Sequence, residues 1–137
     1  MHLTRLISLS VLLASLLFAG CKSSPGNLPD ATARGEAAYR QYKNSDYATA
    51  KGALLDYITF LDRFADTDPT LSNTRMADAM VSYVRLAKLE EKNHGPDAAH
   101  YMTEAVSRCG KLNVKMGNCS PESLRTSVDR IDTVPPK

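Results

Sequence analysis

Apolar residues recur at intervals of three and four along most of the chain after Asp30, and this spacing constrains the fold more than any other feature. That interval places side chains on one face of an α-helix, whereas a half-buried strand needs alternation with a period of two. No stretch of the chain alternates in that way, so the sequence predicts an all-α fold. The clearest helical stripe lies in residues 47–65 and consists of Tyr47, Ala50, Leu54, Tyr57, Ile58, Leu61 and Phe64.

Turn formers and capping residues divide the remaining chain into about five short helices. Asp30 is a suitable cap for the first helix, and Ser45 or Asp46 for the second. Ser120-Pro121-Glu122 is a strong helix start, with a capping hydroxyl, a proline in the first turn and an acid near the positive end of the dipole. We expect these helices to form antiparallel hairpins. Their predicted ranges are 31–43, 47–65, 72–92, 97–108 and 121–131.

The inward faces of these helices are rich in small and aromatic residues. Residues 21–137 contain 14 Ala and six Tyr, a composition that suits close helix packing. The residues that we expect to face inward, outside residues 47–65, are Ala33, Ala37, Ala38, Tyr42, Met76, Met80, Tyr83, Val84, Ala87, Ala98, Tyr101, Met102, Ala105, Leu124, Val128 and Ile131.

Charge is nearly balanced outside the first twenty residues, because residues 21–137 carry 16 Lys and Arg against 15 Asp and Glu. Nucleic-acid-binding domains and membrane-surface binders that work through a basic surplus are therefore excluded. The low aliphatic content of this part would indicate disorder only together with a high net charge. Its length suits one small domain with its own core.

The N-terminal segment differs in character from the rest of the chain. Leu6 to Phe18 is apolar apart from three serines, and Arg5 precedes it. A run of about a dozen apolar residues is too short to span a bilayer as a helix and is typical of a signal-peptide core. The run leads into Ala19-Gly20-Cys21, which resembles the lipobox of bacterial lipoprotein precursors, with Phe18 where Leu is usual.

This resemblance implies that a signal peptide, residues 1–20, is cleaved after Gly20 and that Cys21 becomes lipidated on its sulfur and its amine. Several acyl chains hold a protein far better than one, at ~0.8 kcal/mol per buried methylene. Because Lys22 rather than Asp follows the cysteine, the sorting rule of enteric bacteria implies an outer-membrane lipoprotein that faces the periplasm. The alternatives are a plain secretory signal and an uncleaved membrane anchor.

The lipobox and the helical pattern together give a domain organisation. Lys22 to Asp30 is rich in turn formers, and residues 21–30 are expected to form a flexible tether with a reach of roughly 15–18 Å. The α-helical domain is predicted for residues 31–132 and a short tail for residues 133–137.

Two successive helical pairs, within residues 31–65 and 72–109, have the length of a helix–turn–helix repeat. Asp46-Tyr47 followed by Ala50, and Asp97-Ala98 followed by Ala105, resemble the tetratricopeptide pattern over about residues 31–109, although the second unit lacks the turn tyrosine. The resemblance implies a scaffold that presents a concave face to a peptide or protein, with residues 121–131 as the capping helix. An unrelated small helical bundle is the alternative.

Three cysteines are divided between two roles. With Cys21 assigned to lipid, Cys109 and Cys119 remain, and spare cysteines of an exported protein usually pair. A disulfide would close the loop between the fourth and fifth helices. A redox pair or a metal site is the alternative, but the spacing matches neither a Cys-x-x-Cys motif nor a known ligand pattern with His100.

Other polar residues give little indication of chemistry. His94 and His100 do not share a helix face, and Glu90-Glu91 beside Lys88 and Lys92 is typical of a solvated helix face with local ion pairs. No catalytic motif or phosphate-binding glycine loop is recognisable. We therefore expect no enzyme activity, no cofactor and no metal.

These observations favour an outer-membrane-anchored periplasmic lipoprotein that serves as a non-catalytic protein-binding or envelope-assembly module. Its expected partners are the membrane and an unidentified envelope protein, with no nucleic acid and no small-molecule substrate. The candidate partner surface consists of Tyr39, Tyr42, Tyr83 and Tyr101. The alternatives are an inhibitor or immunity lipoprotein directed against a toxin or a cell-wall hydrolase, and a passive structural component of the envelope.

Overall fold

The computed structural model describes residues 28–64, 69–112 and 117–134, and within these ranges the regular structure is entirely helical. This confirms the all-α prediction and the number of helices. Gly20, Cys21, residues 22–27 of the predicted tether and residues 135–137 of the tail lie outside the described ranges. The helices are α1 (Leu28–Asn44), α2 (Tyr47–Phe64), α3 (Pro69–Lys92), α4 (Ala98–Lys111) and α5 (Pro121–Asp132).

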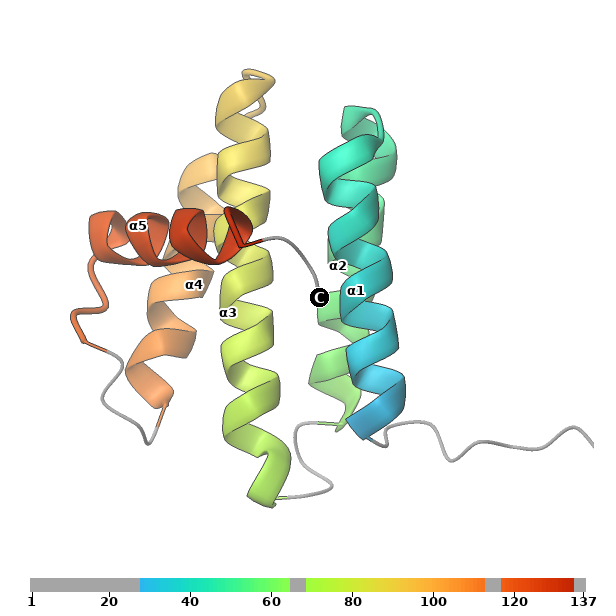
Figure 1. Ribbon diagram of the computed structural model, residues 1–137. Helices are drawn as coiled ribbons and strands as arrows, with labels where there is room; N and C mark the ends of the chain where they lie inside the picture. Colours follow the sequence, from blue (N-terminus) through green and yellow to red (C-terminus); the bar gives the residue numbers. More distant parts are fainter. Residues whose placement is uncertain (1–27, 65–68, 113–116, 135–137) are drawn as a thin grey trace, which may run out of the picture.

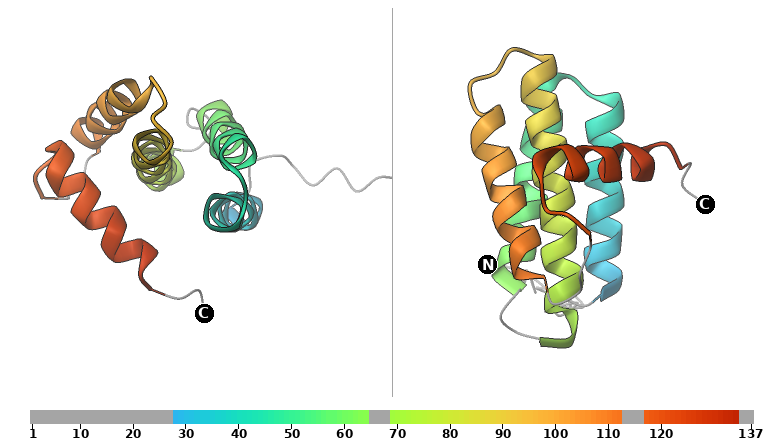
Figure 2. Two further views of the ribbon diagram at one scale, coloured as in Figure 1. Left: turned by 90° about the horizontal axis from the view of Figure 1, so that it is seen from above. Right: turned by 90° about the vertical axis from the view of Figure 1, so that its left-hand side faces the viewer.

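The helices form two adjacent hairpins crossed by a fifth helix. α1 pairs with α2 and α3 pairs with α4, and α2 packs against α3 to join the two hairpins (Figure 1). α5 runs across α3 and α4 at a steep angle, and its C-terminal end points toward α1 (Figure 2). α3 is therefore the central helix, with neighbours on several sides.

The helix starts follow local capping chemistry. The Asp46 carboxylate accepts a hydrogen bond from the Thr49 amide at 3.0 Å and caps α2, and the Ser120 hydroxyl accepts one from the Ser123 amide at 3.3 Å and caps α5. Pro121 occupies the first turn of α5, where its missing N–H costs nothing. The cap at Ser120 was predicted from the sequence, and of the two predicted candidates for α2, Ser45 and Asp46, the structure selects Asp46.

Two helices begin earlier than predicted. α1 begins at Leu28, so Asp30 lies in its first turn and pairs with Arg34 at 3.1 Å instead of capping the helix, and Leu28–Asp30 are not part of a tether. α3 begins at Pro69, because proline is tolerated in a first helical turn.

The core contains two clusters of buried side chains. One lies around Leu54, Val84, Tyr101 and Val128 and joins α2, α3, α4 and α5, whereas the other lies between α1, α2 and α3 around Tyr57. Most of the predicted inward residues are buried or half-buried.

The predicted inward face of α1 was partly wrong. Ala33 and Ala37 are exposed, whereas Ala31 and Ala38 are buried. Gly35 lies on the same side of α1 as Ala31 and Ala38 and approaches α2 closely, because a Cβ atom there would lie 2.7 Å from the Tyr57 hydroxyl oxygen. Because glycine allows this approach, α1 turns the Gly35 face toward α2 and the other alanines face the solvent.

Ile131 was also predicted to face inward and is 49 % exposed. Only Leu124 and Val128 of α5 are buried, because the C-terminal end of this helix extends beyond α3 toward α1. Three ion pairs also link α5 to α3: Arg85 pairs with Asp132, Lys88 with Asp129, and Glu91 with Arg125.

Candidate functional site

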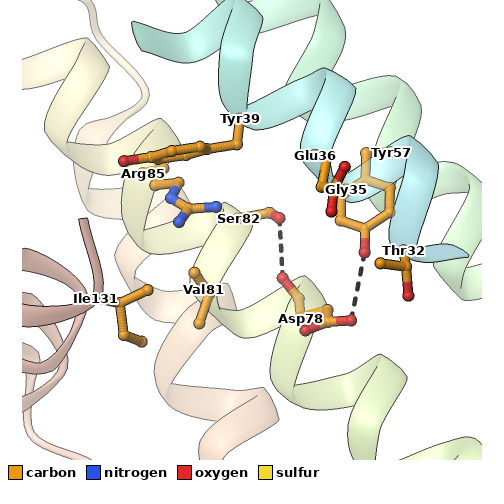
Figure 3. A pocket seen from close by; sticks show the side chains of 10 residues that line it. All are labelled: Thr32, Gly35, Glu36, Tyr39, Tyr57, Asp78, Val81, Ser82, Arg85 and Ile131. Atoms are coloured by element: carbon orange, nitrogen blue, oxygen red, sulfur yellow. Dashed lines mark hydrogen bonds between the residues drawn. The ribbon is translucent and has the colours of Figure 1, made fainter. Parts of the chain in front are cut away.

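A cavity of about 380 Å³ lies between α1 and α3, with α2 behind it and the end of α5 beside it. Its floor consists of the buried residues Tyr57 and Ser82 with the half-buried Asp78, and its rim consists of the exposed residues Thr32, Glu36 and Ile131. Figure 3 shows side chains from all four helices directed at this one space. Its full lining is Thr32, Gly35, Glu36, Tyr39, Tyr57, Asp78, Val81, Ser82, Arg85 and Ile131.

Asp78 is the central group of the floor. Its carboxylate accepts a hydrogen bond from the Tyr57 hydroxyl at 3.3 Å, and its main-chain carbonyl accepts one from the Ser82 hydroxyl at 2.9 Å (Figure 3). Burial raises the pKa of Asp78 above its ordinary value of 3.8, and this effect exceeds the lowering by the Tyr57 hydrogen bond and the Arg85 charge. Burial, together with the charge of Asp78, also raises the pKa of Tyr57.

Arg85 forms one wall of the cavity and is already engaged. Its Nη2 and Nε atoms lie 2.6 Å and 3.1 Å from Oδ1 of Asp132, and its guanidinium stacks 4.4 Å from the centre of the Tyr39 ring. The Tyr39 hydroxyl donates to the main-chain carbonyl of Asp132 at 3.2 Å. These contacts connect α1, α3 and α5 at the edge of the cavity, and they neutralise the positive charge.

A second polar cluster lies at the end of the bundle where α3 meets α2 and α4. Glu90 is fully buried. Its Oε1 accepts a hydrogen bond from the Tyr47 hydroxyl at 2.5 Å and forms an ion pair with the Lys51 ammonium at 2.8 Å. Its Oε2 accepts a hydrogen bond from the Asp97 main-chain amide at 3.1 Å. Lys51 also forms an ion pair with the Asp97 carboxylate at 3.1 Å. Both carboxylate oxygens of Glu90 are thus satisfied.

The position of Glu90 corrects the prediction of a solvated helix face. Of the two neighbouring acids, only Glu91 is exposed, and it pairs with Arg125 of α5 rather than with a lysine of its own helix. Although burial acts against ionisation, the bonds from Lys51, Tyr47 and the Asp97 amide lower the pKa of Glu90 below its ordinary value of 4.5. The same hydrogen bond to Glu90 raises the pKa of Lys51.

The turn after α3 is built around this cluster. His94, not Gly95, has the left-handed conformation, with φ of 56°, and the Gly95 amide donates to the Glu90 carbonyl at 2.8 Å. A Cβ atom on Gly95 would lie 2.0 Å from Oε2 of Glu90. Gly95 therefore serves to let the main chain approach the Glu90 carboxylate closely, and it does not adopt a left-handed conformation.

The four tyrosines predicted as a partner surface lie in two pairs. Tyr39 and Tyr42 lie together with ring centres 6.4 Å apart, and Tyr83 and Tyr101 form another pair at 6.2 Å. Tyr101 is only 7 % exposed and belongs to the core, so it is not accessible to a partner. Of these four residues only Tyr39 lines the cavity.

Cys109 and Cys119 are joined as a disulfide, with their Cα atoms 5.7 Å apart. Cys109 is buried at the end of α4, and Cys119 lies just before the cap of α5. The bond therefore fixes the start of α5 relative to α4. It brings together the two cysteines that the sequence left after Cys21.

Within the described part of the chain, no group of three or more His, Cys, Asp or Glu residues is arranged to hold a metal ion. His94 and His100 are both exposed. None of the described helices is both long enough and apolar enough to cross a membrane.

The cavity residues Asp78, Ser82 and Arg85 were missed at the level of sequence. Their spacing of four and three residues is itself a signal, because it places the three polar side chains in one stripe along the helix. That stripe alone cannot be distinguished from a solvated face. Only the position of α1 and α5 beside it makes it a cavity lining.

We found no protein-family model, no curated protein and no solved structure that matches this chain. The described residues define a small all-helical protein with a cavity beside its central helix.

Proposed function

We propose that this protein is a lipid-anchored module of the bacterial cell envelope that binds another envelope protein without catalysis. The observation that carries the binding role is the cavity between α1 and α3, in which the half-buried Asp78 has no ion-pair partner among the described residues. Burying a charge without pairing it is unfavourable for folding. A binding role explains why such a group is kept, because a partner supplies the missing interaction.

The anchoring role rests on the lipobox-like Ala19-Gly20-Cys21 and on the tether that follows it. The disulfide between Cys109 and Cys119 supports an exported protein, because disulfides persist in oxidising compartments. We place the mature protein at the outer membrane, facing the periplasm, because Lys22 follows the cysteine.

We further propose that the α1–α2 and α3–α4 hairpins are divergent tetratricopeptide-like units, with α5 as their cap. The support is the pair of consecutive hairpins and the burial of Leu124 and Val128 of α5 against the second hairpin. In this arrangement the cap covers apolar surface that a further repeat would otherwise cover.

Lipid attachment is tested by labelling cells with a radioactive fatty acid. We expect the label on the wild-type chain and its loss from Cys21→Ser, with the variant released from the membrane fraction. Label retained by Cys21→Ser would contradict the anchoring proposal.

Partner binding is tested by site-specific photo-crosslinking in intact cells. Probes at Glu36 and Ile131 lie on the rim of the cavity, and a control probe at Ser127 lies on an exposed part of α5. We expect one discrete crosslinked protein from the rim positions and none from Ser127. The same product from all three positions, or none from the rim, would contradict the proposal.

A further inference from the structure

The free hydrogen-bonding capacity on the cavity floor is that of acceptors. The Tyr57 hydroxyl already donates its proton to the Asp78 carboxylate, and the Ser82 hydroxyl donates its proton to the Asp78 carbonyl. What both hydroxyls have left to offer is lone pairs, and an ionised carboxylate offers only lone pairs. The group that complements this floor is therefore one with several donors and no acceptor.

We propose that this cavity binds a primary alkylammonium group, as carried by a lysine side chain or a small aliphatic amine. The ammonium has three N–H donors and no acceptor, and it would meet the Asp78 carboxylate with the Tyr57 and Ser82 oxygens nearby. The inference rests on the binding role proposed above and gives it a ligand chemistry.

The charges around the cavity favour a cation over an anion. Two carboxylates line the cavity, Asp78 and Glu36, of which Glu36 also pairs with the exposed Arg40 at 3.9 Å. Among the described lining residues the cation is Arg85, which is paired with Asp132 and stacked on Tyr39. An anion would approach Arg85 against three acids. A cation would meet the Asp78 carboxylate, which makes no ion pair among the described residues, in a partly desolvated space where charge pairing is stronger than in water.

The walls fit an aliphatic stem. Val81 of α3 and Ile131 of α5 are the two aliphatic lining residues, and both lie to one side of Asp78 in Figure 3. The half-exposed Ile131 at the rim would lose water contact when a methylene chain packs against it. A volume of about 380 Å³ is at the small end of ligand cavities, which suits one long side chain better than a large ligand.

The test is an NMR titration of the full chain in nonionic detergent with small probes. n-Pentylamine carries the ammonium and the aliphatic chain, n-pentanol is its neutral counterpart, and pentyltrimethylammonium keeps the charge without N–H donors. We expect saturable shifts at Tyr57, Asp78 and Ser82 with pentylamine, and binding at least about tenfold weaker with the other two, because the charge-assisted hydrogen bonds are missing.

Two further probes distinguish the source of the amine. A short acetylated peptide with a single lysine is compared with the same peptide carrying Nε-acetyl-lysine. Binding of the lysine peptide alone, in competition with pentylamine, assigns the cavity to a protein side chain. Binding of pentylamine without the peptide assigns it to a small amine, and both results support the ammonium site.

Asp78→Asn is the variant that tests the mechanism, and Glu122→Gln is the matched control because Glu122 is exposed at the far end of α5. We expect Asp78→Asn to lower pentylamine affinity at least about tenfold and Glu122→Gln to leave it unchanged. Tyr57→Phe, which keeps the ring and removes one acceptor, should weaken binding by a smaller factor. Thermal unfolding of each variant checks that it is folded.

The proposal is overturned if pentylamine causes no saturable shift, if pentanol binds as well, or if folded Asp78→Asn binds as tightly as the wild type. Crosslinking from Glu36 and Ile131 is independent of these titrations. A captured partner together with no amine binding would remove the ammonium site and leave the proposed function intact.

Discussion

Two acids of α3, the fully buried Glu90 and the half-buried Asp78, have opposite surroundings. Glu90, at the end of the helix, receives bonds on both oxygens from Lys51, Tyr47 and the Asp97 amide. Asp78, twelve positions earlier in the chain, receives one long bond from Tyr57 and faces a cavity. The comparison shows that burial of an acid does not by itself indicate function. An acid whose oxygens are all bonded by neighbouring helices holds those helices together. An acid with unused acceptor capacity beside a cavity is available to a ligand.

The two regions also differ in which helices build them. The Glu90 cluster joins α2, α3 and α4, and the turn at Gly95 closes it. The Asp78 cavity needs α1 and the end of α5, which the pairing of Arg85 with Asp132 holds in place. The first region belongs to the core of the bundle, whereas the second depends on a helix that crosses it.

The largest effect is expected from Lys51→Met, which leaves Glu90 buried without its cation. Removing one partner of a buried pair is strongly destabilising, and we expect a loss of about 3 kcal/mol in the free energy of unfolding, measured by urea denaturation. Lys51→Met combined with Glu90→Gln should recover most of this loss, because the amide oxygen is uncharged. A loss below about 1 kcal/mol would show that Glu90 is not sealed from water.

Removal of the disulfide, by Cys109→Ala with Cys119→Ala, is expected to cost about 2–3 kcal/mol by the chain-entropy relation for a loop of this size. Hydrogen exchange should accelerate in α5 and around Arg85 and stay slow around Glu90, since α5 lines the cavity and supplies no bond to the Glu90 cluster. Equal acceleration in both regions would contradict this division of the molecule.

Gly95→Ala would place a methyl group against the Glu90 carboxylate, at 2.0 Å from Oε2 before any adjustment. Such overpacking typically costs about 1–3 kcal/mol, and we expect about 2 kcal/mol by thermal denaturation. Gly52→Ala is the control, because a Cβ atom there meets nothing within 4 Å, and alanine should stabilise α2 by up to about 1 kcal/mol. A neutral Gly95→Ala would mean that the turn adjusts freely.

The smallest expected effect is a difference between Asp78 and Glu90 in how each contributes to the pH dependence of stability. Because the folded-state pKa of Asp78 is raised, its proton stabilises the fold at acidic pH, and that contribution is lost as the pH rises through the folded-state pKa. Asp78→Asn should therefore increase stability at neutral pH, by up to about 1 kcal/mol, with little change below the unfolded pKa.

The pKa of Glu90 is shifted in the opposite direction. Its folded-state pKa is lowered, so its contribution is present above the unfolded pKa and is lost as the pH falls through the folded-state pKa. Carboxyl carbon NMR titration should place Asp78 above 3.8 and Glu90 below 4.5. Shifts of the same sign for both acids would remove the distinction between the two regions.

The sequence by itself determined the helices and most of their ends. The caps at Asp46 and Ser120 and the stripe of α2 are local features, because capping and periodicity depend on residues within a few positions of each other. The remaining pair of cysteines, Cys109 and Cys119, was also evident from counting. All three predictions needed no knowledge of how the helices pack.

Only the tertiary structure decided which side of each helix is covered. Ala37 and Ala38 are equally apolar, and the close approach at Gly35 selects the second for burial. Glu90 has the sequence context of a surface acid, and it is buried because α2 and α4 supply Lys51 and the Asp97 amide. The cavity at Asp78 likewise exists because helices distant in sequence meet around a polar stripe, which helical periodicity cannot specify.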